Sequence, residues 1–147
     1  MNIVFLDING VLDTNEKMDE INPDNLKRLK HIVDETKSKI VISSSLKNSY
    51  YLTGHHNKIL KKIMEEIENN KIDIIGITPK CTTRAEEIQM YLINHPEIEN
   101  YCIIDDDYEM ESLKDNLVKL PPQIEPGQKG LEEKYMHQAI KILKRKK

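Results

Sequence analysis

Residues 1–14 read MNIVFLDINGVLDT, and this stretch gives the first indication of the fold. Residues 2–6 are rich in apolar and β-branched side chains, which is typical of a strand buried on both faces. Asp7 follows at once, Asn9 stands two residues later, and Gly10 comes next. A carboxylate directly after a buried strand indicates either a turn or a functional group at the edge of a sheet.

The rest of the chain alternates apolar strands with amphipathic helices. Strands are predicted at 2–6, 39–43, 72–77 and 101–105, with a further candidate at 116–120. Helices are predicted at 23–37, 55–69, 82–94 and 130–147, with caps at Asn22 and at Thr82 or Thr83. This alternation predicts an α/β fold, a Rossmann-like three-layer sandwich with a parallel central sheet.

Composition and length favour a soluble domain. The chain has 147 residues, so we expect a single domain over residues 1–147. Its 32% charged residues suit a solvated surface, and its net charge of −3 excludes an overall basic field. Cys81 and Cys102 form no CxxC pair, and we expect neither a signal peptide nor a membrane-spanning stretch. We therefore expect a cytoplasmic protein.

Polar side chains follow the predicted strands at the point where each one ends. They are Asp7, Ser43-Ser44-Ser45, Thr78-Pro79-Lys80 and Asp105-Asp106-Asp107, after the first four strands in turn. Ligands bind at the carboxyl ends of parallel strands, so we expect these groups to lie together. Apposed carboxylates require a cation, and oxygen ligands beside a phosphate favour Mg²⁺. Since hydroxyl groups and a Lys or Arg suit a phosphoryl group, the strand ends predict a Mg²⁺-dependent phosphoryl-transfer site.

The order of these groups resembles the motifs of the haloacid dehalogenase (HAD) superfamily. Asp7-Ile8-Asn9-Gly10-Val11 is similar to its first motif, DxDGV, and the serines after the second strand resemble its second. A basic residue follows as the third, and the acidic run 105–107 resembles the fourth. The stretches KIVISSSLK, GITP, TRAEEIQMYL, IIDDD and GLEE are also similar to the HAD domain of Swiss-army-knife RNA repair proteins, over nearly the whole chain.

This resemblance implies a nucleophile and a metal site. Asp7 would form an aspartyl phosphate and would also bind Mg²⁺, with the backbone carbonyl of Asn9 as a second ligand. Asp105 and Asp106 would complete the metal site. The protein is thus expected to be a HAD-like phosphatase with Mg²⁺ as its cofactor.

The resemblance also implies a set of phosphate-binding residues. Ser44 would hydrogen-bond the phosphoryl oxygens, with Ser43 as the alternative if the strand ends one residue earlier. Arg84 matches the family's basic residue at the start of the third helix. Lys80, in the preceding loop, competes for the same charge-neutralising role, and we favour Arg84.

Asn9 is a departure from the family pattern. Family phosphatases carry a second Asp here, which protonates the leaving oxygen and then deprotonates the attacking water. An amide can do neither, and general acid–base catalysis contributes roughly 10²–10⁴-fold. Three explanations remain open: a slow or specialised enzyme, a catalytically weak or inactive phosphate-binding module, or a substitution that traps substrate.

The spacing of the motifs leaves no room for a sizeable cap domain. Small-molecule enzymes of the superfamily often close a cap over their substrate, so an open site suits a large one. The subfamily resemblance favours a phosphorylated polynucleotide end as the substrate. A response-regulator receiver domain uses similar groups, but its paired acids follow the first strand, whereas here a single acid comes first.

Overall fold

The structure, a computed structural model, describes residues 1–44, 55–106 and 110–145, with side chains for all of these except 55–57. The elements are β1 (Asn2–Leu6), α1 (Pro23–Thr36), β2 (Ser38–Ile42), α3 (His55–Asn69), β3 (Ile74–Ile77), α4 (Arg84–Asn94), β4 (Asn100–Asp105), the 3-10 helix η1 (Glu111–Asn116), β5 (Leu117–Lys119) and α5 (Glu133–Leu143). Every predicted strand and helix is present in the predicted order, and η1 has no counterpart among the predictions.

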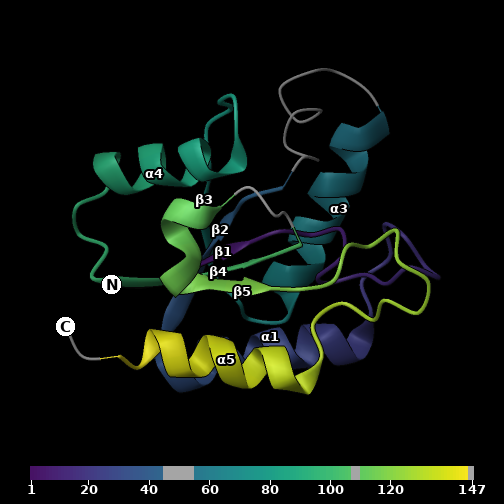
Figure 1. The fold of residues 1–147 in the computed structure, drawn as a ribbon. Coiled ribbons are helices and arrows are strands. Elements are labelled where there is room, and N and C mark those ends of the chain that lie inside the picture. The colour runs from purple at the N-terminus through teal and green to yellow at the C-terminus, as the bar shows by residue number, and fades with distance from the viewer. Residues whose placement is uncertain (45–54, 107–109, 146–147) are drawn as a thin grey trace.

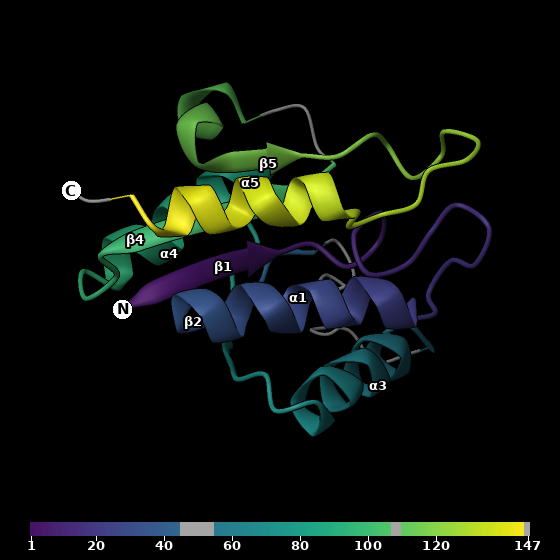
Figure 2. The same ribbon diagram turned by 90° about the horizontal axis from the view of Figure 1, so that it is seen from below.

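The five strands form one sheet in the order β3-β2-β1-β4-β5, with every neighbouring pair parallel. Figure 1 shows α4 on one face of this sheet and α1 and α5 on the other. In Figure 2, α3 lies beside α1, on the same face. The predicted three-layer α/β sandwich is therefore confirmed.

Two apolar cores hold the layers together, and successive side chains along a strand pack alternately into one core and the other. Along β1, Val4 and Leu6 pack into the core under α1, α3 and α5, whereas Ile3 and Phe5 pack into the core under α4 and η1. This period of two is the one expected of a strand buried on both faces. The predicted core position of Cys102 is confirmed, because its side chain is fully buried.

The chain reverses its direction of winding at β1. It runs from β1 outward through β2 to β3, then crosses back to β4 on the other side of β1 and ends the sheet at β5. Loops leaving β1 and β4 must therefore diverge, which opens a crevice at the carboxyl ends of these strands. Asp7 and Asp105 lie at this switch point.

Local capping determines where the helices beside this crevice begin. The Asn22 side chain accepts hydrogen bonds from the backbone N–H groups of Asp24 and Asn25, and Pro23 occupies the first turn of α1. Thr83 caps α4 by accepting from the N–H of Glu86 at 3.2 Å. Because Thr83 rather than Thr82 is the cap, Arg84 becomes the first residue of α4. Among the described helices, none is both long and apolar enough to cross a bilayer.

Candidate active site

Three predicted site residues lie side by side across the central strands. Leu6 pairs with Ile42 of β2 and with Ile104 of β4, and the backbone ladder continues one residue further. Asp7, Ser43 and Asp105 therefore form one row, at most 4% exposed. Strand alternation directs them to the α4 side of the sheet, as it does Phe5.

Arg84 reaches this row from the first turn of α4. Its Nη1 donates to Asp105 Oδ2 at 2.5 Å and to the carbonyl oxygen of Ser43 at 2.7 Å, and it lies 3.7 Å from Asp7 Oδ1. Burial alone would lower the pKa of Arg84, but the surrounding carboxylates outweigh it and raise this pKa. The guanidinium is therefore a permanent cation at the centre of the site.

A third buried acid contacts Arg84 from the same helix. Glu87, one turn along α4, places Oε1 3.7 Å from Arg84 Nε and accepts a hydrogen bond from the N–H of Cys81 through Oε2. Sequence reasoning did not find Glu87, although its i,i+3 spacing from Arg84 is a usable signal. Lys80, the competing cation, is exposed and makes no ion pair with any residue that the structure describes.

The acids of the predicted metal site come together. Carboxylate oxygens of Asp7, Asp105 and Asp106 all lie within 4.8 Å of one another. Burial raises the pKa of Asp7 well above its ordinary value, and repulsion from Asp105 and Asp106 raises it further, while Arg84 opposes both. One guanidinium does not offset three carboxylates, so these residues fit an added hard cation such as Mg²⁺.

The serines after β2 also lie at this edge. Because β2 ends at Ile42, Ser43 rather than Ser44 stands in register with Asp7. The Ser43 hydroxyl is buried and has no hydrogen-bond partner among the described residues. Since buried hydroxyl groups are normally hydrogen-bonded, this group suits a donor to a phosphoryl oxygen of the substrate. Ser44 is also buried, at 1% exposed. Ser45 and Asp107 lie outside the described residues.

Gly10 allows the first motif to approach Asp106. Its φ is +83°, and a Cβ added there would lie 2.6 Å from Asp106 Oδ2.

We expect Gly10→Ala to lower the free energy of unfolding by about 1–2 kcal/mol, because an L-residue is strained at this φ. The added methyl should also displace Asp106 and weaken Mg²⁺ binding. Urea unfolding and Mg²⁺ titration by calorimetry measure the two effects. An alanine variant that binds Mg²⁺ as tightly as the parent would contradict this placement of Asp106.

The loop from Asn9 to Asn22, here called the flap, is organised by an acid that the sequence did not single out. Asp13 is 1% exposed and accepts hydrogen bonds from Gly10 N, Asp19 N, Asn9 Nδ2 and Gln123 Nε2, at 2.6–2.7 Å. The Asn9 side chain, which replaces the usual acid, thus faces Asp13 and also donates to Asp19 Oδ1 at 2.8 Å.

The segment between β5 and α5, here called the rim loop (residues 120–132), ties the flap to the fourth motif. The N–H of Gln123 donates to Asp106 Oδ2 at 3.0 Å, while its side chain donates to Asp13. The Gln128 side chain donates to the carbonyl oxygen of Gly10 at 2.6 Å. These glutamine side chains reach partners more than a hundred residues away in the chain, and neither belongs to a periodic pattern that could have revealed it.

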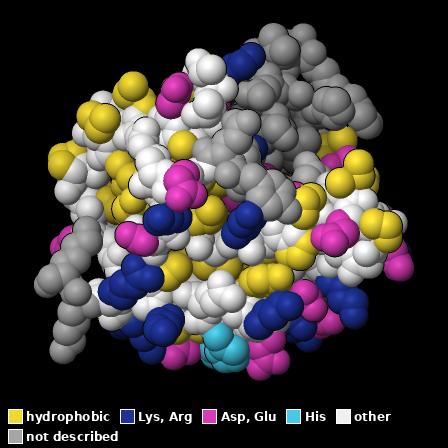
Figure 3. Space-filling model, in the orientation of Figure 1, with side chains coloured by type: hydrophobic (Ala, Val, Ile, Leu, Met, Phe, Trp, Pro, Cys, Tyr) yellow, Lys and Arg dark blue, Asp and Glu magenta, His cyan; other side chains and the backbone are white. Residues whose placement is uncertain are grey.

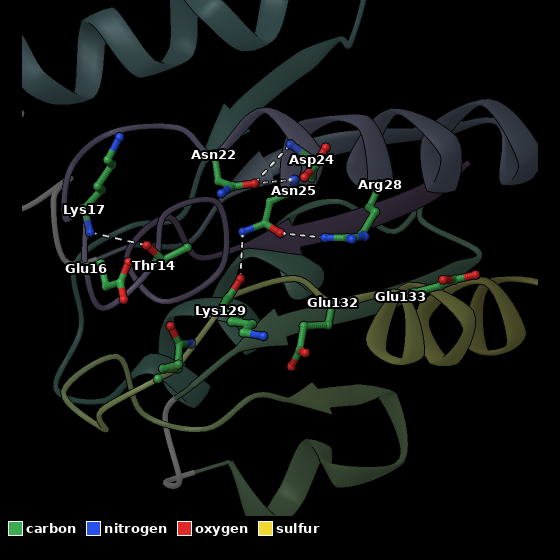
Figure 4. Close-up of a pocket in the computed structure, with 12 residues that line it drawn as sticks. Thr14, Glu16, Lys17, Asn22, Asp24, Asn25, Arg28, Lys129, Glu132 and Glu133 are labelled. Carbon is green, nitrogen blue, oxygen red and sulfur yellow. Dashed lines mark hydrogen bonds between the residues drawn. The ribbon is translucent and has the colours of Figure 1, made fainter.

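A hollow of about 580 Å³ lies behind the flap, between the N-terminal ends of α1 and α5 (Figure 4). Its lining carries both signs of charge, with Lys17, Arg28 and Lys129 beside acids such as Glu132. Of the predicted site residues, none lines it. The acid cluster at the strand ends, and not this hollow, is therefore the candidate active site.

Comparison with known proteins identifies the family of this chain. The chain matches the family described as the HAD domain in Swiss Army Knife RNA repair proteins over residues 3–134. No curated protein and no solved structure matches it significantly. The match spans β2 to β5, all of β1 except Asn2, and every site residue named above. The chain therefore belongs to this family of HAD domains, within the haloacid dehalogenase superfamily.

Proposed function

We propose that this protein is a Mg²⁺-dependent phosphohydrolase that works through an aspartyl phosphate on Asp7. The observation that carries the proposal is the row of Asp7, Ser43 and Asp105, with the Arg84 guanidinium against it and Asp106 within the same cluster. A nucleophile, a hydroxyl donor, a fixed cation and a set of oxygen ligands thus share one sheet edge.

Each group has a part in the first step. An oxygen of Asp7 attacks phosphorus, and the bond to the leaving oxygen breaks, so the phosphoryl group passes to the carboxylate. Ser43 and Arg84 are placed to donate to the equatorial oxygens, where negative charge is concentrated. Asp7, Asp105, Asp106 and the Asn9 carbonyl would hold Mg²⁺, which when bound supplies positive charge against the phosphoryl oxygens.

Asn9 limits which leaving groups depart readily. The leaving oxygen takes up a proton if it is strongly basic, as in an alkyl or ribose phosphate, and an amide has no acidic proton to give. A phenolate of low pKa departs without help. Water attack on the aspartyl phosphate also lacks a base at position 9. We therefore expect slow turnover with a strong preference for good leaving groups.

The first experiment measures Mg²⁺-dependent phosphate release from an aryl phosphate and from an alkyl phosphate. We expect kcat/KM for the aryl ester to be larger by about 10²-fold or more, the lower range of general acid–base catalysis. Addition of EDTA should stop release. Equal rates for the two esters would show that another group supplies the proton. Metal binding with no release from any substrate would favour a phosphate-binding module instead.

We further propose a phosphorylated polynucleotide end as the substrate. The family to which the chain belongs is named for RNA repair, and the spacing of the motifs leaves no room for a sizeable cap domain. On the described part of the face in Figure 3, basic and acidic side chains are interspersed, so this face offers no extended basic track. Contact confined to a terminal phosphate requires no such track. Phosphate release from 3′- and 5′-phosphorylated oligonucleotides tests this.

A further inference from the structure

One amide group closes the flap. The two N–H bonds of Asn9 Nδ2 point at two different carboxylates, Asp13 Oδ2 at 2.7 Å and Asp19 Oδ1 at 2.8 Å. Asp19 is also held by its own backbone N–H, which donates to Asp13 at 2.7 Å. Its φ is +64°, a left-handed conformation that a non-glycine residue adopts at a cost. A few hydrogen bonds therefore hold this turn in an energetically unfavourable backbone conformation.

The Asp13 carboxylate, at the centre of this turn, is stabilised by the groups that donate hydrogen bonds to it. Asp13 is 1% exposed, and no cation lies among its hydrogen-bond partners in the described part of the chain. A buried carboxylate is tolerated only where hydrogen bonds replace its lost hydration. Asn9 supplies one of these bonds and at the same time separates the carboxylates of Asp13 and Asp19.

An aspartate at position 9 would reverse this contact. It would remove both N–H donors and place a third carboxylate against two others, so attraction would become repulsion. The neighbours of position 9 therefore select an amide over the acid that the chemistry would otherwise use.

We propose that Asn9 is a positioning residue whose amide clasps the flap around Asp13 and Asp19, and that this clasp is incompatible with an aspartate at position 9 unless Asp13 changes with it. The clasp rests on the contacts above. Its consequence for turnover rests on the phosphohydrolase function proposed in the previous subsection. Asn9 is then an integral part of the flap rather than a lost catalytic group.

Trypsin cleavage after Lys17 measures opening of the flap. Lys17 is exposed and lies between Asp13 and Asp19, so cleavage there follows the population of the opened flap. We expect Asn9→Asp to raise the initial cleavage rate at Lys17 about tenfold, and Asn9→Ala to raise it by less. Cleavage after Lys80, in a separate exposed loop, is the internal reference for protease activity and should not change.

A double variant that exchanges the residues at positions 9 and 13 tests whether the contact between them can be restored. In the double variant Asn9→Asp with Asp13→Asn, the amide introduced at position 13 can donate to the carboxylate introduced at position 9. The remaining oxygen of that amide can still accept from Gly10 and Gln123, which both use Oδ1 of Asp13. The backbone N–H of Asp19, which donates to Asp13 Oδ2, would then face the introduced amide nitrogen and lose its acceptor. We therefore expect cleavage at Lys17 to fall below the rate of Asn9→Asp without reaching the parent rate, which makes the two substitutions non-additive.

Asn22→Asp is the matched control. It makes the same chemical change at the other end of the flap, but there the side chain only accepts, from Asp24 N and Asn25 N. A carboxylate accepts equally well at a helix N-terminus, so no change in cleavage is expected.

The outcomes separate the clasp from the proposed activity. Parent-like cleavage at Lys17 in both Asn9→Asp and Asn9→Ala overturns the clasp, as does a double variant that opens no less than Asn9→Asp. If Asn9→Asp does not fold, Asn9→Ala and the double variant decide in the same way. In the phosphate assay, the double variant should gain kcat on alkyl phosphates, and Asn9→Asp alone should gain less. If no variant releases phosphate, the proposed function fails, while the cleavage data still decide on the clasp.

Discussion

Asp7→Asn is expected to lower Mg²⁺-dependent phosphate release by at least about 10³-fold, because it removes the attacking oxygen of the proposed reaction. The amide keeps an oxygen that can accept from the N–H of Ile8, as Asp7 Oδ1 does at 2.9 Å, so the loop should keep its shape. Steady-state assays with an aryl phosphate measure the loss. Trapping of the phosphorylated protein, detected as a mass increase on Asp7, should fail in the variant.

The same substitution is expected to stabilise the metal-free protein. The pKa of Asp7 is raised in the folded state, so folding favours the protonated carboxyl, and this contribution is lost as the pH rises through the folded pKa. Asparagine carries no charge at any pH. The variant should therefore match the parent at low pH and exceed it at neutral pH by about 0.5–2 kcal/mol, as is common when a strained catalytic group is replaced.

Urea unfolding at several pH values in EDTA tests this stability change. Asp115→Asn, at an exposed position on η1, is the control for a change from acid to amide away from the site. Two results would contradict the assignment of Asp7 as the nucleophile. One is Asp7→Asn with parent-like turnover, and the other is loss of turnover equally large in Asp115→Asn.

Arg84→Ala is the second substitution for which we expect a large effect, on both stability and activity. Arg84 is 11% exposed, and Asp105, its nearest partner, is fully buried. Removal of one member of a buried ion pair leaves the other uncompensated, which typically destabilises by about 3–5 kcal/mol. Activity should also fall, by about 10²-fold or more, because the same guanidinium faces the phosphoryl position.

Arg84→Lys distinguishes these two losses. Lysine keeps the positive charge but not the planar fork, whose Nη1 donates to both Asp105 and the Ser43 carbonyl. We expect it to recover most of the stability and only part of the activity. Lys80→Ala is the matched control for the competing cation, and should change kcat/KM by less than about twofold. A large effect at Lys80 with none at Arg84 would reverse the assignment.

The fold and the set of chemical groups could be predicted from the sequence alone. Short apolar, β-branched runs, amphipathic helices and the Asn22-Pro23 cap predicted each major element, because these signals arise within a few residues of chain. The order of elements then predicted that Asp7 and Asp105 would meet, since parallel strands bring their carboxyl ends to one edge. The family resemblance stated on these motifs was likewise confirmed.

The choice between neighbouring candidates required the three-dimensional arrangement. Arg84 and Lys80 are four residues apart, and the cap at Thr83 turns one toward Asp105 while the other stays exposed. The end of β2 at Ile42 places Ser43 in the row with Asp7, where sequence had favoured Ser44. A shift of one residue changes the face of a strand, and no local pattern resolves such a shift at a strand end.

The hydrogen-bond partners of Asn9 could not be predicted from the sequence either. The sequence did not single out Asp13, and Gln123 belongs to a loop without periodicity, yet both meet in the hydrogen-bond network that holds the flap. Such contacts depend on how two irregular loops are placed by separate strands, β1 and β5. Backbone hydrogen bonding repeats and is readable from sequence, whereas side-chain partners across loops are specified only once the chain has folded.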